Sequence, residues 1–371
     1  METTNTPPRV LTRMPRRIPV NGTFELTVRC NLHCKMCMFR HDDRENPELM
    51  AKELTAAQWI DMARQAAEAG TMNLLITGGE PLLRPDFCEI WEGIYRQGFV
   101  TTLYTNATLV TPRVMETLRK YPPHKIGVTI YGASPETYGR VCGDESAFQR
   151  MVQGVHNLLL LPSQIEFRMT IIKDNKNDVI PIERFVRKEF GKTYSVIMST
   201  MIYRSVRGAC ADVDSCRLQP KELLALKKMH LKEMARLEFE GKYDLDQLEL
   251  NYVWRDSQPD CESQKELSLF GCKAGMSQYV ISWSGQLIGC QLLDLFAMDA
   301  VGKGFFDAWE QYPFQVKLPP PNQKCQTCKM AKYCETCPAF CYAETGALNE
   351  CSSYIFSNAQ AEMDKYQEVV L

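Results

Sequence analysis

The chain has 371 residues, a formal net charge of −2 and a sequence pI near 6.3. Hydrophobic residues make up 45% and charged residues 24%, the composition of a globular protein that buries a core. This charge balance leaves no basic face for nucleic acid, and the longest apolar run, at residues 158–161, is too short to cross a bilayer. We therefore expect a protein with no nucleic-acid partner and no membrane segment.

The sixteen cysteines are the second informative feature of the composition. The first residues contain no secretory signal, so we expect a cytoplasmic protein whose thiols stay reduced. Such cysteines bind metal more often than they pair as disulfides. They are concentrated at residues 30–37 and 261–351, which predicts a metal-binding loop near the start and a separate metal domain at the end.

Residues 1–19 precede the first of these loops and carry four arginines among prolines. We expect a partly ordered lead-in here. A docking arm for a peptide is the alternative.

The first metal-binding loop follows an apolar run at residues 24–28, which predicts a short strand. Cys30, Cys34 and Cys37 have a C-x3-C-x2-C spacing, so one loop can wrap a single metal centre. A [4Fe–4S] cluster normally takes four thiolates, and three from this loop would leave one iron open to another ligand. An open iron indicates chemistry at the metal. A zinc knuckle is the alternative that the spacing alone leaves open.

Predicted helices and strands then alternate as far as residue 199. The first helix has its N-cap at Thr55 and ends at Gly70. The predicted strands are residues 72–76, 99–104, 125–131, 165–172 and 194–199, and the predicted helices are residues 54–70, 87–96, 112–120, 135–141, 147–161 and 180–189. This alternation indicates βαβ units around a parallel sheet. With the strand before Cys30 there are six units, fewer than the eight that close a barrel, so we expect an α/β fold with a partial (β/α)6 TIM-like barrel.

Functional groups of such sheets collect at the carboxyl ends of the strands. The cysteine loop follows the first strand and Gly78-Gly79-Glu80-Pro81 follows the second, so both lie on one rim. Paired glycines let the backbone approach a ligand closely, and Glu80 can accept hydrogen bonds from an ammonium group. Asn106 follows the third strand. A Gly-Gly-Glu-Pro segment one strand after such a loop indicates a binding site.

Cys30, Cys34 and Cys37, followed by Gly78-Gly79-Glu80-Pro81, resemble the radical S-adenosylmethionine (radical SAM) superfamily. The resemblance implies that the three thiolates hold a [4Fe–4S] cluster whose open iron chelates the amino and carboxylate groups of SAM. The reduced cluster would cleave the sulfonium, and the barrel would shield the 5′-deoxyadenosyl radical.

The same resemblance implies the contacts to SAM. Met36 would contact the adenine and Glu80 would hold the methionyl ammonium. Thr129 matches, more loosely, a serine that contacts the ribose in related enzymes. Arg168 would reach the carboxylate or the ribose of SAM. The alternative is that Arg168 is a structural arginine on the surface. The expected cofactor-binding residues are Met36, Gly78, Gly79, Glu80, Pro81, Asn106, Thr129 and Arg168.

Residues 200–260 are expected to connect the barrel to the second cysteine-rich region. Lys221 to Glu240 predicts a charged amphipathic helix packed on the barrel. Cys210 and Cys216 lie in a polar loop, where we expect free thiols; a substrate-facing loop is the alternative.

The last third of the chain contains the second metal signal. Its thiols are Cys272, Cys290, a Cys325-x2-Cys328-x5-Cys334-x2-Cys337 run, Cys341 and Cys351. Residues 278–289 predict a hairpin that turns at Ser284-Gly285. A zinc ribbon is disfavoured because its two knuckles are usually separated by more than five residues, and because too many thiols remain.

This region resembles the SPASM domain, a C-terminal extension of many radical SAM enzymes that holds two interleaved auxiliary iron–sulfur clusters, here expected as [4Fe–4S]. The resemblance implies that the outer cluster is bound by Cys325, Cys328, Cys334 and Cys351, and the inner one by Cys272, Cys290 and Cys337. The fourth ligand of the inner cluster is left undecided between Cys261, a substrate and a water molecule. The C-x2-C pair of Cys334 and Cys337 departs from the C-x3-C pair of many members, but it recurs in relatives resembling pyrroloquinoline quinone and peptide maturases. Cys341 is a spare thiol or an alternative ligand.

The expected domains are residues 1–19 as lead-in, 20–205 as radical SAM partial barrel, 206–260 as helical connector and 261–371 as SPASM domain with a C-terminal helix. Because SPASM enzymes mostly act on peptides or proteins, the resemblance implies a radical SAM oxidoreductase that matures a ribosomal peptide, by a thioether or carbon–carbon crosslink or by epimerisation. The sulfatase-maturing branch is excluded, since Gln291 stands where that branch has an aspartate. Asp294 is a further carboxylate, with a surface aspartate as the alternative, and no catalytic residue is assigned.

The expected partners are a peptide or protein substrate and an electron donor such as flavodoxin or ferredoxin. Any binding of a leader peptide is expected to need a separate leader-binding protein or the barrel itself, because a cluster loop at residue 30 leaves no room for a leader-binding domain before it. Two alternatives remain: a radical SAM dehydrogenase or epimerase of a small molecule, and a non-catalytic iron–sulfur redox protein. The full set of late cysteines disfavours the first, and the intact Gly-Gly-Glu-Pro segment disfavours the second.

Overall fold

The computed structural model describes residues 17–41, 47–199, 201–209, 211–239 and 268–368. The expectations for most of the lead-in, for Cys210 and Cys261 and for residues 240–260 lie outside this part of the chain. None of the helices in these ranges is long and apolar enough to span a membrane.

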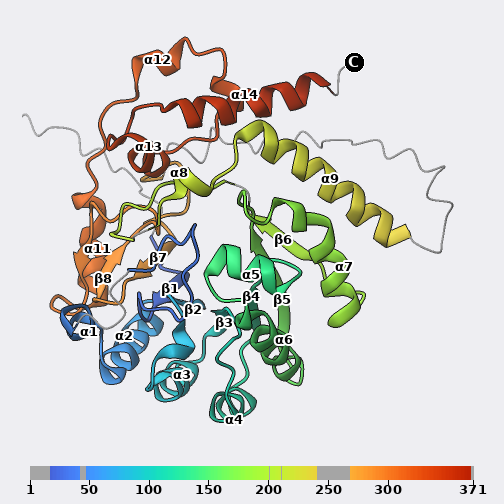
Figure 1. Ribbon diagram of the computed structural model, residues 1–371. Helices are drawn as coiled ribbons and strands as arrows, with labels where there is room; N and C mark the ends of the chain where they lie inside the picture. The colour runs from blue at the N-terminus through green and yellow to red at the C-terminus, as the bar shows by residue number, and fades with distance from the viewer. Residues whose placement is uncertain (1–16, 42–46, 200, 210, 240–267, 369–371) are drawn as a thin grey trace, which may run out of the picture.

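The core of the molecule is a nine-stranded sheet with the order β6-β5-β4-β3-β2-β1-β7-β8-β9. Six of its strands run parallel: β1 (Asn21–Glu25), β2 (Asn73–Thr77), β3 (Val100–Thr105), β4 (Lys125–Thr129), β5 (Gln164–Thr170) and β6 (Val196–Ser199). The sheet curls into an arc with helices on its outside and does not close (Figure 1). The prediction of an α/β partial barrel is confirmed.

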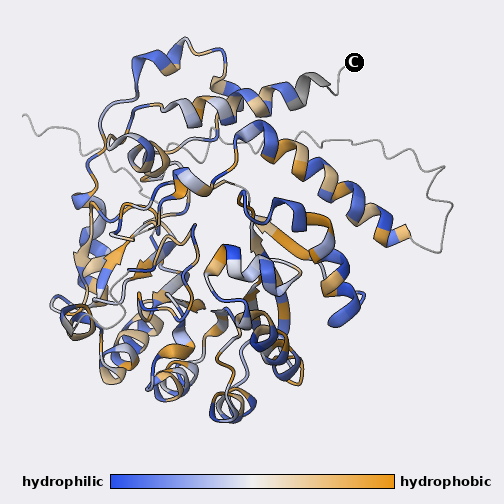
Figure 2. Cartoon of the chain, in the orientation of Figure 1, coloured by the Kyte–Doolittle hydropathy of each residue, from blue (hydrophilic) through white to orange (hydrophobic). Residues whose placement is uncertain are grey.

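The helices of the barrel are α1 (Pro47–Lys52), α2 (Ala56–Glu68), η1 (Pro81–Leu83), α3 (Phe87–Tyr95), α4 (Pro112–Lys120), α5 (Pro135–Cys142), α6 (Ser146–Leu158), η2 (Lys176–Asp178) and α7 (Val179–Glu189). Six of them, α2 to α7, begin within a few residues of the predicted positions, whereas α1, η1 and η2 were not predicted. Side-chain caps start three of them: the hydroxyls of Thr55, Thr111 and Ser134 accept the N–H of the third residue of their helices. Hydrophobic and hydrophilic residues alternate along these helices, as expected when one face packs on a sheet (Figure 2).

The first strand lies three residues earlier than the apolar run suggested. Asn21 pairs with Asn73 of β2 on one side and with Gln278 on the other, so the strand starts there. After Glu25 the chain stays extended and still bonds to the end of β2, since Leu26 N donates to Thr77 O at 2.9 Å.

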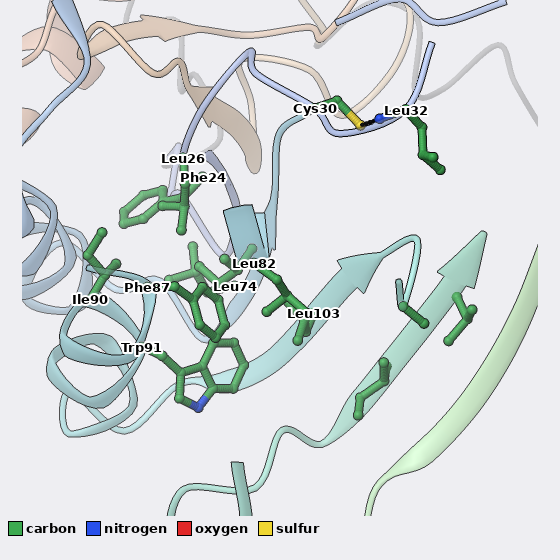
Figure 3. Close-up of a cluster of buried hydrophobic side chains, with 14 of the residues drawn as sticks. Phe24, Leu26, Cys30, Leu32, Leu74, Leu82, Phe87, Ile90, Trp91 and Leu103 are labelled. Atoms are coloured by element: carbon green, nitrogen blue, oxygen red, sulfur yellow. Dashed lines mark hydrogen bonds between the residues drawn. The ribbon is translucent and has the colours of Figure 1, made fainter. Parts of the chain in front are cut away.

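Apolar side chains on the outer face of the sheet form the core between strands and helices. Figure 3 shows Phe24 of β1 and Leu74 of β2 beside Phe87 and Trp91 of α3. A fully buried side chain of this size stabilises the fold by about 1.5–3 kcal/mol. Because successive strand residues point to opposite faces, the inner face of the arc carries the intervening residues, and many of these are polar.

The C-terminal region continues the barrel sheet. Its strands are β7 (Gln278–Ile281), β8 (Gln286–Ile288) and β9 (Met298–Asp299). The predicted hairpin is confirmed: β7 and β8 are antiparallel, and Gly285, with φ +79°, supplies the left-handed turn. Strand β7 also pairs in parallel with β1, which the sequence did not predict.

The remaining helices are α8 (Val213–Cys216), α9 (Pro220–Phe239), α11 (Phe305–Gln315), α12 (Gln323–Gln326), η3 (Ala331–Tyr333), α13 (Pro338–Thr345) and α14 (Ser353–Glu368). Of these, α11 lies beside α2 and β8, α9 lies against α7, and α12, α13 and α14 lie together at the top of the view (Figure 1). A buried ion pair joins the connector to the C-terminal region, with Arg217 Nη1 2.7 Å from Glu344 Oε1. The Arg217 guanidinium also lies 3.8 Å from the ring centroid of Tyr354.

Candidate metal and cofactor site

Three thiols lie in the loop that follows β1, at the carboxyl end of the sheet. Cys30 and Cys34 are buried and Cys37 is half-buried. The end of α5 holds this loop, because His33 N donates to Cys142 O at 2.9 Å and Lys35 N donates to Val141 O at 3.1 Å. These two backbone hydrogen bonds fix the position of the loop against α5.

Backbone N–H groups point at two of these sulfurs. Leu32 N lies 3.4 Å from Cys30 Sγ (Figure 3), and Arg40 N lies 3.2 Å from Cys37 Sγ. Burial and then the neighbouring Cys37 thiol raise the pKa of Cys34 well above its ordinary value. Buried thiols of this kind become thiolates when a metal supplies positive charge, and N–H donors to sulfur stabilise the charged form. The donor set fits an iron–sulfur cluster.

Glu80 is the buried carboxylate of the rim, with 1% of its surface exposed. It accepts hydrogen bonds from Thr105 Oγ1 at 2.7 Å, Asn106 N at 2.7 Å and Leu82 N at 3.1 Å. Burial nevertheless raises the pKa of Glu80 to about 7. A cationic ligand would favour the ionised form, so the residue suits an ammonium group.

The two glycines before Glu80 let two backbone segments lie against each other. A Cβ at Gly79 would overlap the carbonyl of Arg29, and a Cβ at Gly78 would overlap that of Thr27. Glu80 N donates to Arg29 O at 2.9 Å. The close approach that the sequence suggested for a ligand is thus made by the chain that leads into the cysteine loop, and it fixes Glu80 beside Cys30.

The other expected cofactor residues lie around this point. Met36 and Pro81 are buried. The side-chain amide of Asn106 donates to Asn31 Oδ1 at 3.0 Å and lies 3.8 Å from Cys30 Sγ, so Asn106 orients the cysteine loop.

Thr129 and Arg168 are paired residues on β4 and β5 and face the inside of the arc. Arg168 Nη1 donates to Tyr104 OH at 2.9 Å and to Glu166 Oε1 at 2.5 Å. Arg168 is therefore half-buried on the inner face and does not extend from the outer surface. Lys125 Nζ lies 3.3 Å from Glu166 Oε2, so the inner face is polar and charged below the rim.

The late cysteines gather in two groups, as their mutual effects show. The pKa of Cys337 is raised to about 11, mainly by burial and in smaller part by the nearby Cys290 and Cys272 thiols. Burial also raises the pKa of Cys334, with contributions from the Cys325, Cys328 and Cys341 thiols. Burial raises the pKa of Cys351 as well, with contributions from those three thiols and from Cys334. The second group comprises Cys325, Cys328, Cys334, Cys341 and Cys351.

No three His, Cys, Asp or Glu side chains among the described residues surround the position of a single metal ion. A [4Fe–4S] cluster needs one ligand per iron, so its thiolates lie farther apart than the ligands of one ion. Cys341 is buried with its Sγ 3.5 Å from Thr336 Oγ1, and Cys261 lies outside the described residues. Cys216 is a buried free thiol whose Sγ lies 3.7 Å from Lys35 O.

Sequence reasoning missed a charged pair at the mouth of the barrel. Glu25 and Arg207 form two hydrogen bonds, Nη1 to Oε1 at 2.9 Å and Nη2 to Oε2 at 2.6 Å. The single acidic residue within the first apolar run was a signal for Glu25, whereas Arg207 is 182 residues away and has none.

Comparison with known proteins bears on these residues. Residues 24–186 match the radical SAM superfamily. A relative from Methanosarcina barkeri, AdoMet-dependent heme synthase, is 26% identical over 93% of this chain and 97% of its own length. PqqA peptide cyclase from Rhizobium meliloti is 32% identical, but over 40% of this chain and 37% of its own length.

Two solved structures share the fold. SuiB from Streptococcus suis, bound to S-adenosylmethionine, has a TM-score of 0.66 at 17% identity, covering 91% of this chain and 77% of SuiB. The enzyme anSMEcpe with bound AdoMet has a TM-score of 0.64 at 15% identity, covering 95% of this chain and 98% of that one. Both structures match the barrel and the C-terminal region of this chain. At such low sequence identity, the similarity is evidence for the fold alone.

Proposed function

The chain belongs to the radical SAM superfamily, and from this premise we propose that it is an enzyme that cleaves SAM reductively and abstracts hydrogen from a substrate at the mouth of the barrel. When bound, the cluster and SAM supply a 5′-deoxyadenosyl radical. The observation that carries the proposal is the buried Glu80 carboxylate, held by three donors beside a loop of three thiols. A redox protein without SAM has no need of it.

The chain's own residues would divide the work as follows. Cys30, Cys34 and Cys37 hold the cluster, and Glu80 holds the methionyl ammonium. Asn106 positions the cysteine loop through Asn31. Around SAM we place Met36 at the adenine and Thr129 and Arg168 at the ribose or carboxylate, with Gly78, Gly79 and Pro81 shaping the rim.

We assign the late cysteines to two auxiliary clusters, expected as [4Fe–4S], in a SPASM domain. The proximity of Cys337 to Cys290 and Cys272 supports an inner cluster. Cys334, only three residues before Cys337, is assigned to the outer cluster instead. Proximity also supports an outer cluster with Cys325, Cys328, Cys334 and Cys351 as ligands. The boundaries proposed for the barrel, connector and SPASM domain are residues 20–205, 206–260 and 261–371, and Cys261 stays a proposed inner ligand.

A peptide or protein is the substrate that we propose first, with the chain as a cytoplasmic ribosomal peptide maturase of the oxidoreductase class. PqqA peptide cyclase is a relative through the barrel, and the fold neighbours include SuiB bound to the precursor peptide SuiA and anSMEcpe bound to a Cp18Cys peptide. A flavodoxin or ferredoxin would supply electrons, and a separate protein would bind the leader.

A tetrapyrrole is the second candidate substrate, within the small-molecule alternative. The relative that matches 93% of this chain and 97% of its own length is named AdoMet-dependent heme synthase, whereas the peptide cyclase matches 40% of the chain. A second Methanosarcina barkeri relative, 28% identical over 45% of this chain, is named Fe-coproporphyrin III synthase, so this tetrapyrrole is a suitable probe. Mass spectrometry after incubation with peptides encoded beside the gene, or with Fe-coproporphyrin III, would separate the two candidates by which one changes mass.

The proposed activity is tested by anaerobic reconstitution with iron and sulfide, followed by SAM and dithionite. We expect 5′-deoxyadenosine from the wild type and none from Cys30→Ala, measured by liquid chromatography and mass spectrometry. Cys88→Ala is the matched control, because Cys88 lies on α3 outside all three thiol groups. A fully iron-loaded wild type that forms no 5′-deoxyadenosine contradicts the proposal.

A further inference from the structure

The pair of Glu25 and Arg207 is buried where barrel and C-terminal region meet. Their side chains are 1% and 6% exposed. Phe24 packs on Trp59 of α2, so the next residue, Glu25, points to the inner face of the arc. A buried ion pair is often no more stabilising than an apolar pair of similar size, so stability alone gives little reason for this one.

Arg207 lies between the first cysteine loop and the inner group of late cysteines. Its Nη1 donates to Gln291 O, next to Cys290, at 3.1 Å, and its carbonyl is 3.1 Å from His41 Nε2. Ser205 Oγ, on the same segment, lies 3.2 Å from Met38 O, next to Cys37. The segment thus bridges the two candidate metal centres.

Arg207 keeps its positive charge in this position. Burial acts against the guanidinium charge, but the hydrogen bonds and charge of Glu25, with Asp294 and Cys290 nearby, leave the pKa of Arg207 raised. The Trp283 ring centroid lies 5.9 Å from the guanidinium carbon. The residue therefore offers a permanent cation beside an apolar face.

Arg207 retains two hydrogen-bond donors on one edge. A guanidinium has five N–H groups. Glu25 takes one from each Nη and Gln291 takes the other of Nη1, which leaves Nε–H and the second Nη2–H. These two are parallel and match the two oxygens of a carboxylate. No acceptor among the described residues bonds to this edge of Arg207.

Other arginines near the rim use the same edge on a partner within the chain. Arg29 binds Glu53 through Nε at 3.0 Å and Nη2 at 2.8 Å. Arg204, three residues before Arg207, binds Asp214 through Nε and Nη2, both at 2.7 Å. Arg207 differs in that no described residue accepts a hydrogen bond from this edge.

We propose that Arg207 binds a carboxylate of the substrate through its Nε–H and Nη2–H edge, while Glu25 holds the guanidinium in place. The inference rests on the proposed function and narrows the substrate to a molecule with a carboxylate near the hydrogen that is removed. An acidic side chain of a peptide and a carboxylate of a tetrapyrrole are the two sources of this group.

The test measures binding to the reconstituted protein with SAM, using two acids and their neutral counterparts. One arm uses fluorescence anisotropy of a fluorescein-labelled octapeptide with a central glutamate, and of its glutamine version. The other uses the Soret absorbance of Fe-coproporphyrin III and of its tetraamide. We expect one of the two acids to bind at least about tenfold more tightly than its neutral counterpart, since hydrogen bonds to charged groups are worth about 1.5–3 kcal/mol.

Arg207→Gln is expected to remove this preference, weakening the acid by about 10- to 100-fold and leaving its neutral counterpart unchanged. Arg207→Lys keeps the charge without the fork and should fall between. Arg204→Gln, with the same change of charge on the same segment, is the matched control and should keep the preference. Iron content and circular dichroism show whether each variant is folded, and Glu25→Gln serves if Arg207→Gln is not.

Three results overturn the inference: acids and neutral counterparts that bind alike in both arms, an acid preference that survives in Arg207→Gln, and a loss of SAM binding in that variant, measured by equilibrium dialysis. The last would mean that the bound carboxylate is that of SAM. Because these readouts are binding constants, a protein that prefers an acid but forms no 5′-deoxyadenosine contradicts the proposed function alone.

Discussion

Glu80 is the rim residue whose chemistry depends most on its neighbours. The glycines before it press against residues 27–29, and its two oxygens accept hydrogen bonds from Thr105, Asn106 and Leu82. These donors fix the direction of the carboxylate, whereas burial sets the pKa of Glu80 at about 7. The hydrogen-bond donors thus set the orientation of the Glu80 carboxylate, whereas its burial sets its protonation.

Replacing Glu80 by Gln is expected to weaken SAM binding by about 10- to 100-fold, because a charged hydrogen bond is worth about 1.5–3 kcal/mol. The wild-type affinity should also fall by up to about tenfold per unit as the pH drops below about 7, since the free carboxyl takes up a proton that SAM must displace. Equilibrium dialysis at several pH values measures both effects. An equally steep pH dependence in Glu80→Gln would show that another group is responsible.

Gly79→Ala is expected to lower stability by roughly 3 kcal/mol and to reduce the iron bound after reconstitution, because the new Cβ overlaps the backbone of Arg29. Gly98→Ala is the control: its φ is +86° but nothing lies within 4 Å, so only about 1–2 kcal/mol of backbone strain is expected. Thermal unfolding and iron analysis measure the outcome. Equal effects of the two substitutions would mean that the close approach at Gly79 is unimportant.

At the scale of elements, the C-terminal region is attached through β7 and through the connector. Strand β7 pairs with β1, the strand that leads into the cysteine loop. On the opposite side, Arg217 after α8 forms its buried ion pair with Glu344 of α13, and Arg204 Nη1 donates to Glu344 O at 2.9 Å. The two attachments hold the late cysteines at a fixed place above the barrel mouth.

Glu344→Gln is expected to destabilise the protein by about 1.5–3 kcal/mol, because it removes charged hydrogen bonds from Arg217, which keeps Asp214 as its second partner at 2.6 Å. The effect should appear as a lower Tm and as iron lost first from the late cysteines. Arg64→Gln, which breaks surface ion pairs on α2, should leave Tm unchanged. Matching Tm values for Glu344→Gln and the wild type would exclude a structural role of the buried pair.

At the scale of the whole molecule, the thiols proposed as metal ligands form three groups. One group belongs to the barrel and two to the C-terminal region, and the segment with Arg207 lies between the first group and the inner late group. With the proposed clusters in place, a substrate bound near Arg207 would lie between the proposed SAM centre and the proposed inner auxiliary cluster. The fold and the proposed chemistry agree at this level.

Iron analysis tests this layout. The reconstituted wild type should hold about twelve iron atoms per chain, four for each [4Fe–4S] cluster, and a variant with Cys30, Cys34 and Cys37 all replaced by Ala should hold about eight. Cys337→Ser and Cys334→Ser should each disturb a different auxiliary cluster, as seen by electron paramagnetic resonance. The same spectral change in both variants would contradict the two separate groups of late cysteines.

The local patterns of the sequence determined much of this protein: the alternation of strands and helices, the N-caps, the turn at Gly285 and the spacing of the cysteines. These depend on residues close together in the chain, so they can be recognised without a structure. The tertiary structure alone decided that β7 joins β1, that Arg168 turns inward to Tyr104, and that Glu25 meets Arg207 with one edge of the guanidinium left free. Each is a contact between distant parts of the chain, set by how the sheet curls and where the C-terminal region docks, and no local pattern encodes it.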